Sequence, residues 1–133
     1  EIETRAALAG WYNIPVIFLT GDQAAAEDLR AVVPNAEVVV VKEALSYYSC
    51  ISLAAEAAQS LIEQGARRAW ERRHEIRPYR VEGPVTFEVE YTTRNTLHPA
   101  LPLRPGVERV DARTLRFRGK DFMEAWLLWR SGE

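Results

Sequence analysis

An unbroken apolar segment that runs directly into a Thr-Gly-Asp turn is the feature that most constrains the fold of this chain. The segment covers residues 16–20, VIFLT, and lacks alternation of polar and apolar residues. Such continuity predicts a strand covered on both faces in a parallel sheet. Gly21 permits a tight turn, and Asp22 can cap a helix beginning at Gln23 by accepting its free backbone N–H groups. Ligands of open α/β sheets usually bind at this end of a strand, so the turn is a candidate site.

A second apolar strand is predicted at residues 36–41, after a helix over residues 23–33. Two buried strands joined by one helix form a βαβ unit. We therefore expect residues 16–19 and 38–41 to be adjacent parallel strands, with the helix packed across them.

Composition indicates a globular protein. The chain has 133 residues, of which 47% are hydrophobic and 27% charged, and these proportions disfavour disorder and membrane spans. A net charge of −2 does not favour nucleic acid as a partner. Because the single Cys50 cannot form an internal disulfide, we expect a cytoplasmic protein in which Cys50 is a small buried residue. No signal peptide is evident, and a helix over residues 1–12 that is already under way at Glu1 suggests a piece of a longer protein.

The middle of the chain predicts a loop and then a long helix. Residues 44–52, ALSYYSCIS, show no clean period and are interpreted as a loop or short turn. We expect Ser52 to cap a helix over residues 53–74, which has apolar residues, Trp70 among them, at helical spacing and which Gly65 weakens slightly. This helix ends in a cluster of arginines with interleaved glutamates. A solvated helix end explains the cluster better than a nucleic-acid or phosphate surface, because cations are stabilised at helix C-termini.

From Tyr79 onward the sequence alternates apolar and polar residues, which predicts strands with one solvent-exposed face. Residues 85–91 alternate apolar and polar side chains, and the segments 107–110 and 114–118 predict a hairpin. A terminal helix is predicted over residues 122–130, whereas the prolines of residues 95–105 allow little more than a short broken helix.

The predicted fold class is therefore α/β. A partial parallel sheet with flanking helices occupies residues 1–77, and a small antiparallel α+β unit occupies residues 78–133. Leu127 and Leu128 widen the apolar band of the terminal helix, so we expect the second unit to have a largely apolar outer surface that serves subunit contacts.

Few residues match a known catalytic pattern. The turn TGDQAAAED lacks the later glycines and the lysine of phosphate-binding loops, and His74 and His98 lack the spacing of metal ligands. The remaining candidates are Asp22, Lys42 and Glu43 at strand ends and Glu1 on the first helix. Taken alone, Asp22 is more readily a helix cap than a catalytic group, and Lys42 is more readily part of a surface ion pair than a substrate-facing ammonium.

Five segments occur in a distinctive order: ALAGWYNIPVIFLTGDQAAAEDLR, VVVVKEALSYYS, VEGPVTFEVEY, PGVERVDARTLRF and DFMEAW. No single segment is specific, but their shared order and spacing are. Through them the chain resembles the C-terminal half of the zinc-dependent D-aminopeptidases associated with dipeptide-transport operons, metallopeptidase family 55.

The resemblance implies that the intact protein hydrolyses N-terminal D-amino acids from short peptides with a dinuclear zinc site. It places one metal ligand at Glu1, and the other ligands and the catalytic histidine upstream of this chain, so that the isolated chain is inactive. Asp22 and Lys42 would flank the site as substrate-binding residues, and the ring assemblies of the family imply a homo-oligomer without nucleic-acid or membrane partners. The alternative is a non-enzymatic α/β assembly module or a small-molecule-binding module.

Overall fold

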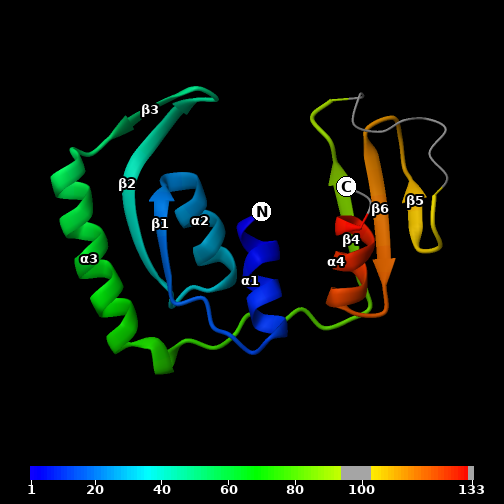
Figure 1. Ribbon diagram of the computed structural model, residues 1–133, viewed down its shortest axis with the longest axis horizontal. Coiled ribbons are helices and arrows are strands. Elements are labelled where there is room, and N and C mark those ends of the chain that lie inside the picture. The colour runs from blue at the N-terminus through cyan, green and yellow to red at the C-terminus, as the bar shows by residue number, and fades with distance from the viewer. Residues whose placement is uncertain (94–102, 132–133) are drawn as a thin grey trace. The chain divides into compact units, whose positions relative to one another are not determined.

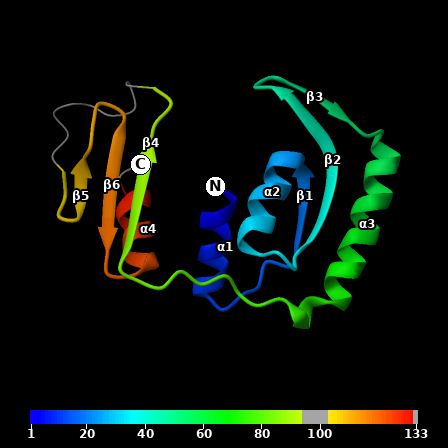
Figure 2. The same ribbon diagram turned by 180° about the vertical axis from the view of Figure 1, so that it is seen from behind.

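The computed structural model describes residues 1–93 and 103–131 (Figure 1 and, from behind, Figure 2). The chain divides into two units, Glu1–Arg80 and Val81–Glu133. The first unit contains a partly parallel sheet with helices, and the second contains a small antiparallel sheet with one helix, which confirms the predicted fold class. No helix in the described ranges is both long and apolar enough to cross a membrane. His98 and most of the predicted broken helix lie outside those ranges.

The first unit is built around a sheet in the order β1-β2-β3. Its elements are α1 (Ile2–Trp11), β1 (Phe18–Asp22), α2 (Gln23–Val32), β2 (Glu37–Ser46), β3 (Ser49–Ser52), α3 (Ala55–Glu71) and the 3-10 helix η1 (Arg73–Glu75). Strands β1 and β2 are parallel neighbours, with Phe18 opposite Glu37 and Thr20 opposite Val39. This pairing confirms the βαβ prediction, although β1 begins two residues later than expected and continues to Asp22.

Helices cover both faces of this sheet. Figures 1 and 2 show α1 and α2 on one side and α3 on the other. On the α2 side, Leu29 is completely buried and forms a core with Ala6, Val33 and Ile76. On the α3 side, the helix approaches closely through Gly65, where an added Cβ would lie 2.4 Å from Val39 Cγ2 and 2.9 Å from Phe18 Cε2. The glycine that weakens the helix is therefore the residue that lets it pack.

The predicted loop at residues 44–52 is wrong, because β2 continues to Ser46 and returns as the antiparallel strand β3. Ser52 belongs to β3 and does not cap α3, whose N-cap position is Ala54 without a side-chain hydrogen bond. Cys50 is exposed on this hairpin and is not the buried residue that we expected.

The arginines at the end of α3 are paired, in agreement with a solvated helix end. Arg68 forms a 2.7 Å ion pair with Glu37, and Arg67 forms one of the same length with Glu63. Trp70 does not pack into the core as its helical spacing suggested, since it is 62% exposed. The guanidinium of Arg73 instead lies 4.2 Å from the centre of the Trp70 ring.

The second unit has an antiparallel sheet in the order β4-β6-β5, with α4 packed against it. Its elements are β4 (Val85–Glu90), β5 (Val107–Arg109), β6 (Thr114–Gly119) and α4 (Phe122–Arg130). The predicted hairpin and terminal helix are confirmed. Leu115 and Phe117 form the buried face with the rings of α4, whereas Arg116 pairs with Glu88 at 2.7 Å and with Glu108 at 3.4 Å.

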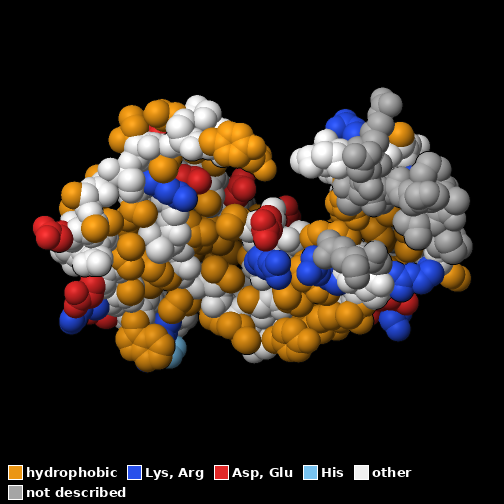
Figure 3. Space-filling model, turned by 45° about the horizontal axis from the view of Figure 1, so that its top comes forward, with side chains coloured by type: hydrophobic (Ala, Val, Ile, Leu, Met, Phe, Trp, Pro, Cys, Tyr) orange, Lys and Arg blue, Asp and Glu red, His pale blue; other side chains and the backbone are white. Residues whose placement is uncertain are grey.

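We expected a largely apolar outer surface on the second unit, but most of the exposed large apolar side chains lie on the first unit. Leu127 is 56% exposed, as predicted, but Leu128 packs into the core of the second unit. Ten of the thirteen exposed large apolar side chains among the described residues lie in the first unit. Several belong to the β2–β3 hairpin, where Figure 3 shows apolar side chains at the surface.

Candidate functional site

The carboxyl end of β1, where its parallel pairing with β2 stops, brings two of the predicted site residues together. Gly21 pairs with Val40, and the next residue, Asp22, pairs with Lys42, so that Val41 is an extra residue on β2. This bulge lies where the parallel pairing ends. Bulges re-aim side chains and are common next to functional sites.

Asp22 has a structural role at this edge. Its Oδ1 accepts a 2.9 Å hydrogen bond from the backbone N–H of Ala25, and the residue caps α2. The cap confirms the more conservative interpretation of Asp22. The side chain does not line the adjacent pocket.

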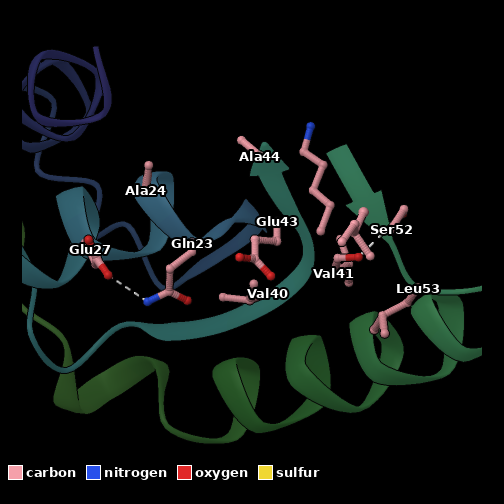
Figure 4. Close-up of a pocket in the computed structure, with 11 residues that line it drawn as sticks. Gln23, Ala24, Glu27, Val40, Val41, Glu43, Ala44, Ser52 and Leu53 are labelled. Carbon is pink, nitrogen blue, oxygen red and sulfur yellow. Dashed lines mark hydrogen bonds between the residues drawn. The ribbon is translucent and has the colours of Figure 1, made fainter. Parts of the chain in front are cut away.

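Lys42 lines a pocket of about 580 Å³ between the start of α2 and the β2–β3 hairpin. Figure 4 shows Gln23 and Glu27 entering from α2, Glu43 from β2 and Leu53 from the segment that follows β3. Gln23 Nε2 donates a 2.8 Å hydrogen bond to Glu27 Oε1.

Sequence reasoning missed the contribution of Ile51 and Leu53 because it interpreted the hairpin as a loop, and it did not assign Gln23 or Glu27 of the correctly predicted α2 to the site. The Tyr and Ile residues of this segment have high β-propensity and could have indicated a strand pair.

Glu1 lies elsewhere on the first unit. Its side chain is exposed and its Oε1 is 3.6 Å from Arg5 Nη2. Nowhere in residues 1–93 and 103–131 do three or more His, Cys, Asp or Glu side chains gather in a way that could hold a metal ion. The described residues therefore do not form a complete metal site, and His74 is exposed on η1.

Comparison with known proteins decides the family. The family model described as D-aminopeptidase matches residues 1–131. This chain belongs to the D-aminopeptidase family. A curated D-aminopeptidase from Bacillus subtilis (strain 168) is 26% identical over 127 residues, which are 95% of this chain and 46% of that protein.

A solved structure supports the same fold. It is described as "Zn-dependent D-aminopeptidase DppA from Bacillus subtilis, a self-compartmentalizing protease", and it matches 98% of this chain with a TM-score of 0.81 at 22% identity. The match covers 48% of that protein. The chain thus spans about half the length of the D-aminopeptidase relatives that it matches.

Proposed function

We propose that this chain is the C-terminal part of a zinc-dependent aminopeptidase that removes D-amino acids from the N-terminus of short peptides. The observation that carries the proposal is the family match over residues 1–131, together with the same fold in a zinc-dependent D-aminopeptidase. The relatives are about twice as long, which is consistent with a metal site completed by residues outside this chain.

Within this proposal, Glu1 supplies one carboxylate to a dinuclear zinc site and Lys42 faces the peptide. Asp22 caps α2 where β1 ends at this edge of the sheet. Because the described residues form no complete metal site, we assign no hydrolytic step to the chain alone. We place the intact protein in the cytoplasm.

A chimera tests the proposal. Residues 1–131 would replace the matching part of the B. subtilis relative, and hydrolysis of D-alanyl-D-alanine and zinc content would be measured. We expect zinc-dependent turnover in the chimera and none in the 133-residue chain alone. Glu1→Gln should lower both zinc content and turnover, whereas Glu56→Gln on α3 should lower neither. A chimera that folds and binds zinc but hydrolyses no D-peptide would refute the function, and unchanged zinc content in Glu1→Gln would refute the ligand assignment.

We also propose that the protein forms a homo-oligomer, with residues 78–133 contributing subunit contacts through the exposed Leu127. The self-compartmentalizing relative supports assembly. Light scattering on the intact protein tests this role, and a strictly monomeric species over the micromolar range would exclude it.

A further inference from the structure

The β2–β3 hairpin carries the two most exposed large apolar side chains among the described residues. Tyr47 and Tyr48, in the turn of the hairpin, are 91% and 92% exposed, and their rings lie 4.7 Å apart, edge to face. Leu45 and Ile51 on the same hairpin are also exposed. Single exposed apolar residues are ordinary, but a group of them marks an interaction surface.

Strand β3 is an open edge of the first sheet. Among the described strands it pairs only with β2, and the hairpin extends past the end of β1 (Figure 1). Alternate residues of an edge strand direct their backbone N–H and C=O groups away from the sheet. All four residues of β3 are exposed, whereas β1 at the other end of the sheet is mostly half-buried. Strand β3 therefore has room for a further strand beside it.

This edge lacks the features that protect open edges from pairing. Natural proteins place charged residues or prolines on such strands. The edge strands of the second sheet follow this rule, since β4 contains Glu88 and β5 contains Glu108 and Arg109. In contrast, residues 44–55, which include β3, contain no charged residue, no proline and no glycine.

A second copy of this chain fits the edge. Two β3 strands related by a twofold axis run antiparallel and satisfy each other's outward backbone groups. Because residues 44–55 carry no charge, the two copies do not repel each other there. A standard interface buries about 800 Å² of each partner, and two exposed tyrosines supply roughly 300 Å² or more of that area.

We propose that β3 pairs with β3 of a second copy of this chain, so that the two hairpins form one continuous antiparallel sheet. Tyr47 and Tyr48 pack against the second copy. Opposite residues of paired strands share a face, and neighbouring residues of one strand do not, so the axis passes through a residue that meets its own copy. At the centre of β3 this residue is Cys50 or Ile51. The inference rests on the proposed homo-oligomer and adds a surface to the one at Leu127.

Crosslinking at Cys50, the single cysteine of the chain, tests the pairing directly. With the axis at either residue, the two Cys50 side chains lie opposite or diagonal to each other, about 5 Å or 7–8 Å apart, within reach of a short bismaleimide. We expect a covalent dimer of the 133-residue chain at micromolar concentration.

The crosslinking control is the double variant Cys50→Ser, Gln59→Cys, because Gln59 is also exposed but lies on α3. It should crosslink about tenfold more slowly or less, since pairing raises the effective concentration of one thiol beside the other only at Cys50. Equal rates would indicate random collision and would overturn the pairing.

A charge introduced at the edge should weaken the dimer. Ile51→Lys places two like charges near the axis and should raise the dimer Kd by about tenfold or more. Ile14→Lys is the matched control, because Ile14 is 56% exposed, Ile51 is 60% exposed, and Ile14 lies outside the hairpin. Sedimentation velocity would measure Kd, and circular dichroism would confirm folding. The joint change of Tyr47 and Tyr48 to serine is a second test that leaves β3 intact and should also raise Kd. An unchanged Kd in the folded variants would overturn the inference.

The intact protein distinguishes a second copy from residues of the same molecule. Peptide mapping after crosslinking should find Cys50 joined to Cys50. If Cys50 reacted neither with the crosslinker nor with a simple maleimide, other residues of the same molecule would cover the edge, and the inference would fail. It would also fail if Leu127→Ser, but not Ile51→Lys, dissociated the oligomer. These readouts do not depend on zinc or turnover, so an inactive chimera would refute only the aminopeptidase function.

Discussion

The two units differ in how completely they bury their apolar residues. In the second unit, the ring of Phe87 on β4 contacts three aromatic rings of α4, and the opposite face of the sheet carries ion pairs between arginine and glutamate. In the first unit, no residue of β1 is fully buried, although its sequence has the continuous apolar character of a doubly covered strand. The second unit thus matches its sequence pattern more closely than the first.

This difference shows that the order of apolar and polar residues in a strand indicates how many of its faces are covered. Alternation in β4 and β6 describes a sheet with one covered face, and α4 supplies that cover within the unit. The continuous apolar sequence of β1 is typical of a strand that is covered on both faces. Among the described residues, β2 and the helices that contact β1 do not cover it completely. The relatives are about twice as long as this chain. Under the proposed function, we therefore expect residues of the intact protein outside this chain to cover β1.

Replacing one phenylalanine in each unit with alanine tests this contrast and should give the largest change in the free energy of unfolding. Phe117 is 3% exposed, so Phe117→Ala should lower the free energy of unfolding of the second unit by about 3–5 kcal/mol. Phe18→Ala should cost less, because Phe18 is only partly buried. Hydrogen exchange with mass spectrometry would follow each unit separately. A larger loss of protection with Phe18→Ala would reverse the comparison.

The close approach of α3 in the first unit is tested by Gly65→Ala. The new methyl group would meet Val39 and Phe18 inside contact distance, and overpacking of this kind costs about 1–3 kcal/mol. Alanine favours a helix over glycine by about 1 kcal/mol, which offsets part of that cost. Gly21→Ala is the control, because its Cβ would meet only Ala25 Cβ at 3.6 Å. Urea denaturation would measure both variants, and a stabilised Gly65→Ala would contradict the packing described for α3.

Each unit also has a helix that begins with an aspartate cap. Removing these caps should change the free energy of unfolding less than the core substitutions do. Asp22→Ala should destabilise the first unit by about 1 kcal/mol. Asp121 Oδ1 accepts a 2.8 Å hydrogen bond from the backbone N–H of Glu124 and so caps α4, and Glu124 Oε2 accepts a hydrogen bond from the backbone N–H of Lys120. This reciprocal arrangement should make Asp121→Ala at least as costly as Asp22→Ala. Thermal unfolding would decide the order, and a costlier Asp22→Ala would contradict it.

Sequence reasoning succeeded where local chemistry determines the structure. The cap at Asp22 and the parallel pairing of β1 with β2 were predicted, whereas the predicted turn at Thr20 to Asp22 is wrong, because these residues continue β1 and α2 begins directly at Gln23. The β2–β3 hairpin was missed because its strands lack a clean period and their pairing extends β2 past its parallel partner. Cys50 is exposed because β3 pairs with β2 alone among the described strands and no described element covers that position.

The candidate site was predicted only in part for the same reason. Lys42 and Asp22 were expected at one sheet edge, and they form the last pair of the parallel ladder, where β1 ends and β2 continues. The contribution of Ile51 and Leu53 to the pocket depends on the hairpin and could not be found without it. Glu1 was assigned through family resemblance, and no arrangement among the described side chains could have indicated that role.

The smallest contrast between the units is their response to pH. In the first unit, a 2.7 Å hydrogen bond from the Tyr79 hydroxyl to Glu3, followed by burial and the negative charge of Glu3, raises the pKa of Tyr79 above its ordinary value. A raised pKa stabilises the fold below about pH 10, and this contribution is lost as pH rises through the folded-state pKa. In Tyr79→Phe, the free energy of unfolding should therefore decrease less steeply with pH in the alkaline range.

In the second unit, the backbone N–H of Arg113 and then the hydroxyl of Thr114 donate to Asp111 and lower its pKa. A lowered pKa stabilises the fold above about pH 4, and this contribution is lost as pH falls through the folded-state pKa. Asp111→Asn retains an acceptor oxygen but cannot titrate, so it should flatten the acid limb. Urea midpoints measured across pH for both variants would show two separate limbs. If Asp111→Asn altered the alkaline limb, or Tyr79→Phe the acid one, the assignment of one pH response to each unit would fail.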